Sequence, residues 1–71
     1  MTEKELFIRI GKNITRIRKS KGYTINHVAA ECDMEKSNLI PIEKGRINVT
    51  AGTLLRIAEV LEVDVKEFFK I

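Results

Sequence analysis

Apolar residues recur at helical spacing along almost the whole chain, and this pattern limits the available folds most. Near the start they are separated by three and four residues, at Phe7, Ile10, Ile14 and Ile17. Residues at these spacings share one face of an α-helix. The branched run at 47–50 is too short to form a strand, and no segment alternates apolar and polar residues for long enough to form one. The pattern predicts an all-α fold, and 71 residues leave room for a single domain, 1–71.

Capping residues and glycines divide the chain into five short expected helices. Thr2 and Glu5 have the spacing of a capping box, in which each side chain satisfies a free amide at a helix start. Gly22 suits the left-handed residue that ends a helix. Asp64 and Glu67 repeat the capping-box spacing before the last segment. The five helices are expected at about 3–21, 25–32, 35–44, 51–61 and 65–71.

The inward faces of these helices predict the core. The fourth helix has a broad apolar face, formed by Leu54, Leu55, Ile57, Ala58 and Leu61. Cys32 is expected to be a small core residue, because free cysteines are among the most buried residue types. In the last segment, Phe68 is expected inside the molecule.

The chain lacks the residues of a catalytic or metal site. It contains one histidine, His27, and one cysteine, Cys32, which lie five positions apart. At ~100° per residue they point to different faces of a helix, so they do not form a nucleophile–base pair. A zinc site needs four ligands, and the scattered glycines form no phosphate-binding loop. We therefore expect no enzyme, no metal, no cofactor and no small-molecule ligand.

The same composition gives no sign of membrane insertion or secretion. No apolar run approaches the ~20 residues that a membrane span requires. The N-terminus is polar and charged, unlike a secretory signal. A cytoplasmic protein is the expectation.

Positive charge is concentrated in the middle of the chain. Residues 9–46 hold nine basic and four acidic side chains, whereas 1–8 and 47–71 each carry a net charge of −1. The whole chain has a net charge of +3. A local basic excess indicates where an anionic partner docks.

A short turn from Asp33 to Glu35 separates the second and third expected helices. A turn of this length makes two helices cross steeply, as in a helix-turn-helix, which here spans about 24–45. The second helix of that motif enters the major groove of DNA. Its outward positions are Lys36, Ser37, Ile40, Pro41 and Lys44.

These features occur within a longer pattern that covers nearly the whole chain. Its segments are Ile14-x-x-Ile17-Arg18-x-x-Lys21-Gly22-Tyr23-Thr24, Val28-Ala29, Met34, Ser37-Asn38-Leu39, Ile42-Glu43-Lys44-Gly45, Asn48 and Thr53-Leu54-Leu55-x-Ile57-Ala58-x-x-Leu61-x-Val63. The stretch Ile10–Phe69 thereby resembles the lambda-repressor-like, Cro/XRE-type helix-turn-helix family. The resemblance implies a compact bundle of five short helices that binds double-stranded DNA. Most members are transcription regulators, usually dimers on near-palindromic sites.

The resemblance also implies roles for individual residues at the DNA. Lys36 and Ser37 occupy the positions where family members touch base edges. A lysine there can either donate to guanine O6 and N7 or contact a phosphate. Lys44, Arg46 and Asn48 match the loop that holds backbone phosphates. We also expect an apolar contact from Ile40 and Pro41 to a thymine methyl group.

Two further positions complete the expected phosphate contacts. Many members carry glutamine directly after the cap of the second helix, where this chain has Ile25. Asn26 is expected to replace that phosphate-binding side chain, and Lys21 to add a cation beside it. Within the scaffold, the resemblance implies a buried ion pair between Arg18 and Glu43.

Pro41 leaves two alternatives for the third helix. Inside a helix, proline removes one hydrogen bond and crowds the preceding turn, at a cost of ~3 kcal/mol or more. The helix is either continuous and kinked, which we favour, or restarts with Asn38 as its N-cap, which would place Pro41 in the first turn.

One recognition helix reads too few base pairs for specificity, which predicts a homodimer with half-sites ~34 Å apart. Phe69 and Ile71, in the apolar C-terminal segment, are the expected dimer contacts. Two alternatives remain from the sequence: a protein–protein adaptor without specific DNA reading, and an antitoxin that uses Phe69–Ile71 to hold a toxin.

Overall fold

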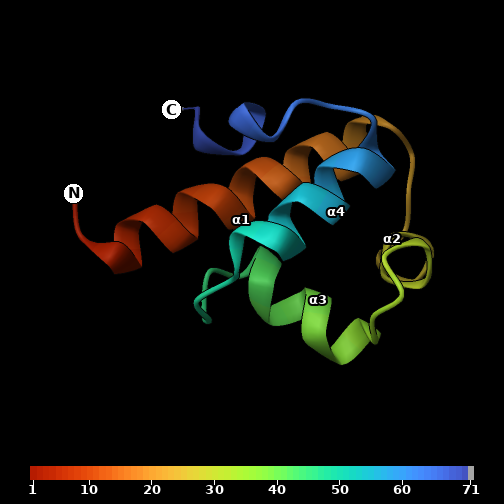
Figure 1. Cartoon of the computed structure of the whole chain (residues 1–71), viewed down its shortest axis with the longest axis horizontal. Coiled ribbons are helices and arrows are strands. Elements are labelled where there is room, and N and C mark those ends of the chain that lie inside the picture. Colours follow the sequence, from red (N-terminus) through yellow and green to blue (C-terminus); the bar gives the residue numbers. More distant parts are fainter. Residues whose placement is uncertain (71) are drawn as a thin grey trace.

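The computed structural model describes residues 1–70, which form four α-helices and one short 3-10 helix (Figure 1). No helix in this part of the chain is long and apolar enough to cross a membrane. Ile71, one of the expected dimer contacts, lies outside the described residues. The elements are α1 (Glu3–Ser20), α2 (Ile25–Glu31), α3 (Lys36–Glu43), α4 (Ala51–Leu61) and η1 (Val65–Phe69).

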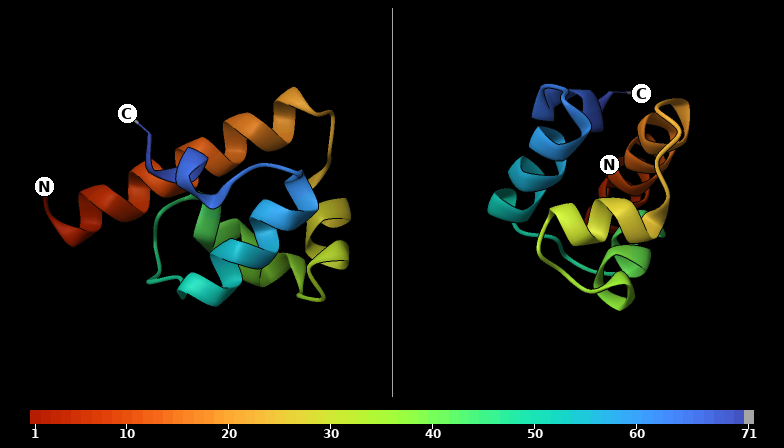
Figure 2. Two further views of the ribbon diagram at one scale, coloured as in Figure 1. Left: turned by 45° about the horizontal axis from the view of Figure 1, so that its top comes forward. Right: turned by 90° about the vertical axis from the view of Figure 1, so that its right-hand side faces the viewer.

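The long helix α1 organises the bundle by packing against both α3 and η1. The short helix α2 contacts α3 and α4. Seen along the bundle, α1, the start of α2 and α3 lie on one side, with α4 and η1 on the other (Figure 2, right). The molecule therefore has two distinct faces.

The core lies between these two sets of elements and is almost wholly aliphatic. Its largest fully buried side chains are Phe68, Ile14, Leu39, Ile57, Leu61 and Val28. Cys32 also lies in it with 2% of its surface exposed, and Phe68 is completely buried, both as predicted.

Local signals in the sequence account for where the helices begin. At α1 the predicted capping box is present: the Glu5 amide donates to Thr2 Oγ1, and the Thr2 amide donates to Glu5 Oε1 at 2.8 Å. The hydrogen bond from the Thr2 amide lowers the pKa of Glu5. Thr24 and Thr50 cap α2 and α4 in the same way, by accepting from an amide three residues ahead.

Each α-helix ends in the same pair of backbone hydrogen bonds around one left-handed residue. Gly22 and Gly45 fill this position after α1 and α3, with φ of 76° and 69°. Asp33 and Glu62 fill it after α2 and α4, with φ of 55° and 59°. A left-handed residue here lets the next amide reach back five residues, as Met34 does to the Ala29 carbonyl.

The expectation of five α-helices is wrong for the last segment, which is the 3-10 helix η1. The Asn13 side chain donates to the carbonyls of Phe68 and Lys70, at 2.8 and 2.7 Å. These bonds tie the end of the segment to α1, and Lys70 has already left the helix for an extended conformation. A contact across the fold therefore replaces the next turn of helix.

The second capping box also fails to form. The carboxylate of Asp64 accepts from the amide of Lys66, whereas the amide of Glu67 donates to the backbone carbonyl of Asp64. Glu67 pairs instead with Lys70, at 2.9 Å. The cap of η1 is thus an Asx-turn, in which the Asp64 side chain accepts from the amide two residues ahead.

Leu55 is a second correction, because it lies at the surface with 51% of its area exposed. Leu54, Ile57 and Leu61 fill the inward sector of α4. Leu55 directly follows Leu54, and one residue of helix rotates the side chain by ~100°, which places Leu55 outside that sector. The apolar face of α4 is therefore wider than the part that the core covers.

Pro41 lies inside a continuous α3. Glu35 is the N-cap, and the amide of Asn38 donates to the Glu35 carbonyl, so Asn38 belongs to the first turn. The alternative of a restart at Asn38 is wrong. Because proline has no amide hydrogen, the Ser37 carbonyl has no partner four residues ahead.

The junction of α1 and α3 depends on a glycine. A Cβ at Gly11 would overlap the carbonyl of Glu43 and lie 2.7 Å from the carbonyl of Ile42. The absence of a side chain therefore lets the end of α3 rest directly on α1.

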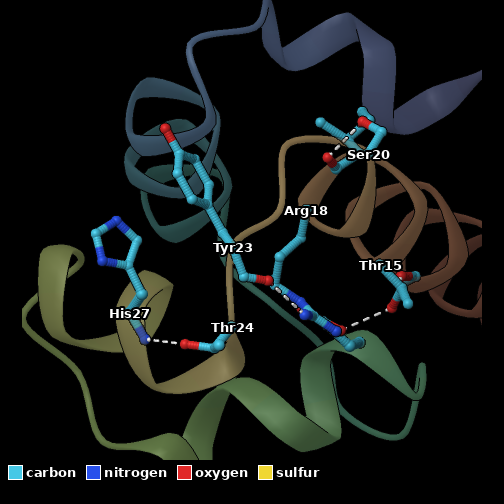
Figure 3. Close-up of polar contacts among 9 residues, drawn as sticks. Thr15, Arg18, Ser20, Tyr23, Thr24 and His27 are labelled. Carbon is cyan, nitrogen blue, oxygen red and sulfur yellow. Dashed lines mark hydrogen bonds and ion pairs between the residues drawn. The ribbon is translucent and has the colours of Figure 1, made fainter.

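A buried ion pair closes the same junction (Figure 3). Arg18 Nε donates to Glu43 Oε2 at 2.8 Å, and the two side chains are only 9% and 6% exposed. A second arginine nitrogen reaches Glu43 Oε1 at 3.1 Å, and a third donates to the Tyr23 carbonyl. The Thr15 hydroxyl donates to Glu43 as well, so both charges are fully solvated by protein groups.

We expect Gly11→Ala to lower the free energy of unfolding by ~1–3 kcal/mol, because the methyl group would push α3 away. Gly52→Ala is the matched control: a Cβ there meets nothing within 4 Å, so it should raise stability by ~0.5–1 kcal/mol. Urea unfolding followed by circular dichroism measures both. A neutral Gly11→Ala would contradict the close approach.

We expect Arg18→Met to destabilise by ~3–5 kcal/mol, because the Glu43 carboxylate would remain buried without a cation. The double variant Arg18→Met/Glu43→Leu should recover most of that loss, since no charge remains to be solvated. Thermal unfolding of the single and double variants tests this. Equal losses in both would show that the pair is not buried as described.

Candidate nucleic-acid interface

The helix pair α2 and α3 is joined by four residues, Cys32 to Glu35. Asp33 takes the left-handed conformation and turns the chain sharply after α2. Short polar residues adopt this conformation more easily than most, so an aspartate is tolerated at this position. The turn directs α3 across α2, with Leu39 and Ile42 of α3 buried in the core.

The first turn of α3 projects from the molecule. Lys36 and Ser37, the expected base-reading residues, are both exposed, as is Asn38. Glu35 makes no side-chain cap, so its carboxylate is free to accept from Ser37 Oγ, at 3.3 Å. The beginning of α3 thus presents a lysine ammonium, a hydroxyl and a carboxylate to its surroundings.

The second turn of α3 is less polar and less exposed. Ile40 and Pro41, the expected thymine contacts, are both half-buried. Their accessible parts adjoin the exposed first turn on the same helix. The outward face of α3 therefore changes from polar to apolar along its length.

The residues expected to hold phosphates occupy two separate places. All five are exposed: Lys21, Asn26, Lys44, Arg46 and Asn48. Lys21 and Asn26 flank the connection between α1 and α2, and the other three follow α3. The structure thus sets cations and amides on both sides of the helix pair, rather than in one cluster.

The start of α2 is fixed by its cap and by a pair of rings (Figure 3). Thr24 accepts from the His27 amide at 3.0 Å. The His27 and Tyr23 rings lie with centroids 4.8 Å apart and an interplanar angle of 35°. His27 is exposed on the surface of the helix.

The thiol of Cys32 is buried beneath this motif. Burial raises its pKa, so the reactive thiolate form is disfavoured at neutral pH. Within residues 1–70, no three histidine, cysteine or acidic side chains come together as they would around a metal ion.

Three basic residues of α1 lie beside this surface, and they were not among the expected site residues. Lys12, Arg16 and Lys19 line an open groove that α1 forms with Ile25 of α2 and with Ile40 and Lys44 of α3. Their spacing of four and three residues predicts a shared helix face. That signal was present in the sequence, but it does not reveal which elements lie alongside.

Known proteins resemble this chain both in sequence and in the arrangement of helices. A family model described as a helix-turn-helix domain matches residues 11–70. The HTH-type transcriptional regulator SlrR of Bacillus subtilis is 41% identical over 61 residues, which cover 84% of this chain and 40% of SlrR. The chain therefore spans less than half the length of that relative.

Two crystal structures share the arrangement of helices. A helix-turn-helix family transcriptional regulator from Vibrio cholerae has a TM-score of 0.89 and 31% identity, over 96% of this chain and 38% of that one. The restriction-modification controller protein C.AhdI from Aeromonas hydrophila has a TM-score of 0.85 over 89% of this chain and 96% of its own. Its identity is 24%, so that likeness concerns the fold alone. With the family match over most of its length and α2 and α3 set as described, the chain belongs to the Cro/XRE-type helix-turn-helix family.

Proposed function

We propose that the chain is a sequence-specific transcription regulator that binds double-stranded DNA through α3. The observation that carries this proposal is the exposed first turn of α3, which stands clear of the core between exposed cations on either side. A helix presented in this way fits the major groove while its neighbours meet the phosphates.

Base reading is assigned to Lys36 and Ser37, with an apolar contact from Ile40 and Pro41. A lysine ammonium matches the acceptors of guanine, and an apolar surface matches the thymine methyl group. Because half of the outward face is apolar, one copy of α3 provides few directional contacts. Each good bidentate contact discriminates by only ~1–3 kcal/mol, whereas specific binding exceeds non-specific binding by ~4–10 kcal/mol.

A homodimer on a near-palindromic operator supplies the missing discrimination. The surface that α4 and η1 leave uncovered carries two exposed large apolar side chains, one on each element. They are Leu55, 51% exposed, and Phe69, 43% exposed. We assign the dimer contact to this surface, so that two copies can present α3 to successive major grooves.

Selection of duplexes from a random library identifies the preferred site. The expected result is a near-palindrome whose half-sites lie one helical turn apart, ~34 Å. A single short asymmetric motif would contradict the dimer. The absence of any enriched motif, with binding insensitive to salt, would favour a protein–protein adaptor or an antitoxin.

Two variants then separate base reading from phosphate binding on the selected site. Lys36→Ala should reduce the preference for the selected site over random duplex, at a cost of ~1–3 kcal/mol in specific binding. Arg46→Ala should weaken binding to both duplexes equally. It should also make the salt dependence of binding less steep, by the amount expected for the loss of about one phosphate contact. Fluorescence anisotropy over a salt series measures both effects. If the two variants behave identically, the division of roles is wrong.

A further inference from the structure

A basic groove runs between α1 and α3, next to the recognition surface. It is open to solvent, with a volume of about 600 Å³. Its exposed cations are Lys12, Arg16 and Lys19 from α1 and Lys44 directly after α3. Its apolar part comes from Ile25 and Ile40.

The positive charge of this groove is not neutralised by the protein. Among residues 1–70 the structure records two ion pairs, Arg18–Glu43 and Glu67–Lys70. Glu43 is the one acidic residue that lines the groove, and its carboxylate is fully engaged by Arg18 and Thr15. The remaining cations therefore face solvent without a local carboxylate.

The groove is continuous with the proposed DNA-binding surface. Ile40 and Lys44 belong both to its lining and to the outward positions of α3. Figure 2 shows α1, the start of α2 and α3 on one side of the bundle, so the groove that they form lies on the same side as α3. A ligand bound along α3 would therefore lie next to the cations of the groove.

The groove also lies where a phosphate donor is missing from α2. Ile25, the first residue of α2, is half-buried and has no side-chain donor. Lys12 and Lys19 stand across the groove from it. At 1.5 Å per residue, Lys12 and Lys19 are ~10 Å apart along α1. They are therefore spaced to contact a stretch of DNA backbone rather than a single phosphate.

We propose that Lys12, Arg16 and Lys19 form a second phosphate-binding track, which holds the DNA backbone next to the segment read by α3. This inference rests on the proposed function and extends the contact surface onto α1. The ligand is the phosphodiester backbone of the same duplex. The lysine ammonium groups and the Arg16 guanidinium contact its phosphates, which fixes the orientation of the domain without adding sequence preference.

The test compares Lys19→Gln with Lys66→Gln, which removes the same charge from η1, outside the residues that line the groove. Both lysines are exposed, and circular dichroism melting checks that folding is unchanged. For Lys19→Gln we expect ~5- to 10-fold weaker binding to the selected duplex at ~0.1 M salt, with a salt slope lower by ~0.9. Lys12→Gln/Lys19→Gln should lower the slope by about twice as much.

The selected motif should be the same for these variants as for the unaltered chain, while hydroxyl-radical protection is lost only on the backbone next to α1. For Lys66→Gln, affinity and slope should not change. If Lys19→Gln and Lys12→Gln/Lys19→Gln both bind like Lys66→Gln while Arg46→Ala weakens binding, the track on α1 is wrong and DNA binding stands. If the unaltered chain shows no salt-dependent binding to DNA, the proposed function itself fails.

Discussion

The contact between α1 and the end of α3 determines where the recognition helix points. Gly11 allows the backbones to touch, and the Arg18–Glu43 pair fixes the register between them. Separating such a pair would leave a buried charge without a partner. The free-energy cost of that state keeps α1 and the end of α3 together. The helix α3 is short and contains a proline, and on its own it would have little tendency to form. Its conformation and its direction both depend on α1.

This anchoring divides the molecule into two faces with different chemistry. On one face, exposed cations of α1 and of the segment after α3 surround a helix whose first turn is polar and free. The elements α4 and η1, in contrast, carry the exposed apolar side chains Leu55 and Phe69. Separate faces allow one surface to meet an anion while the other meets a second copy. This separation links the two parts of the proposed function.

The sequence predicts those parts of the fold whose causes are local. Threonine caps and left-handed residues set the ends of the α-helices, and the short turn at Asp33 sets the helix pair. The last segment was mistaken because its conformation depends on Asn13, which lies 55 positions from Phe68 in sequence. Leu55 was misplaced because an apolar sequence does not show how wide a sector the core covers. The basic spacing on α1 was visible, but only the fold brings it beside Ile25 and Ile40.

The most direct test of the account is nuclear magnetic resonance of the isotopically labelled chain titrated with its selected duplex. We predict that amide shifts concentrate in α3, in the segment from Lys44 to Asn48, at the start of α2 and along the basic side of α1. The buried junction at Gly11 and Arg18 should stay in the same environment, because it positions α3 without moving. Shifts confined to α4 and η1, or spread evenly over the chain, would contradict the claim that α3 is the surface that meets DNA.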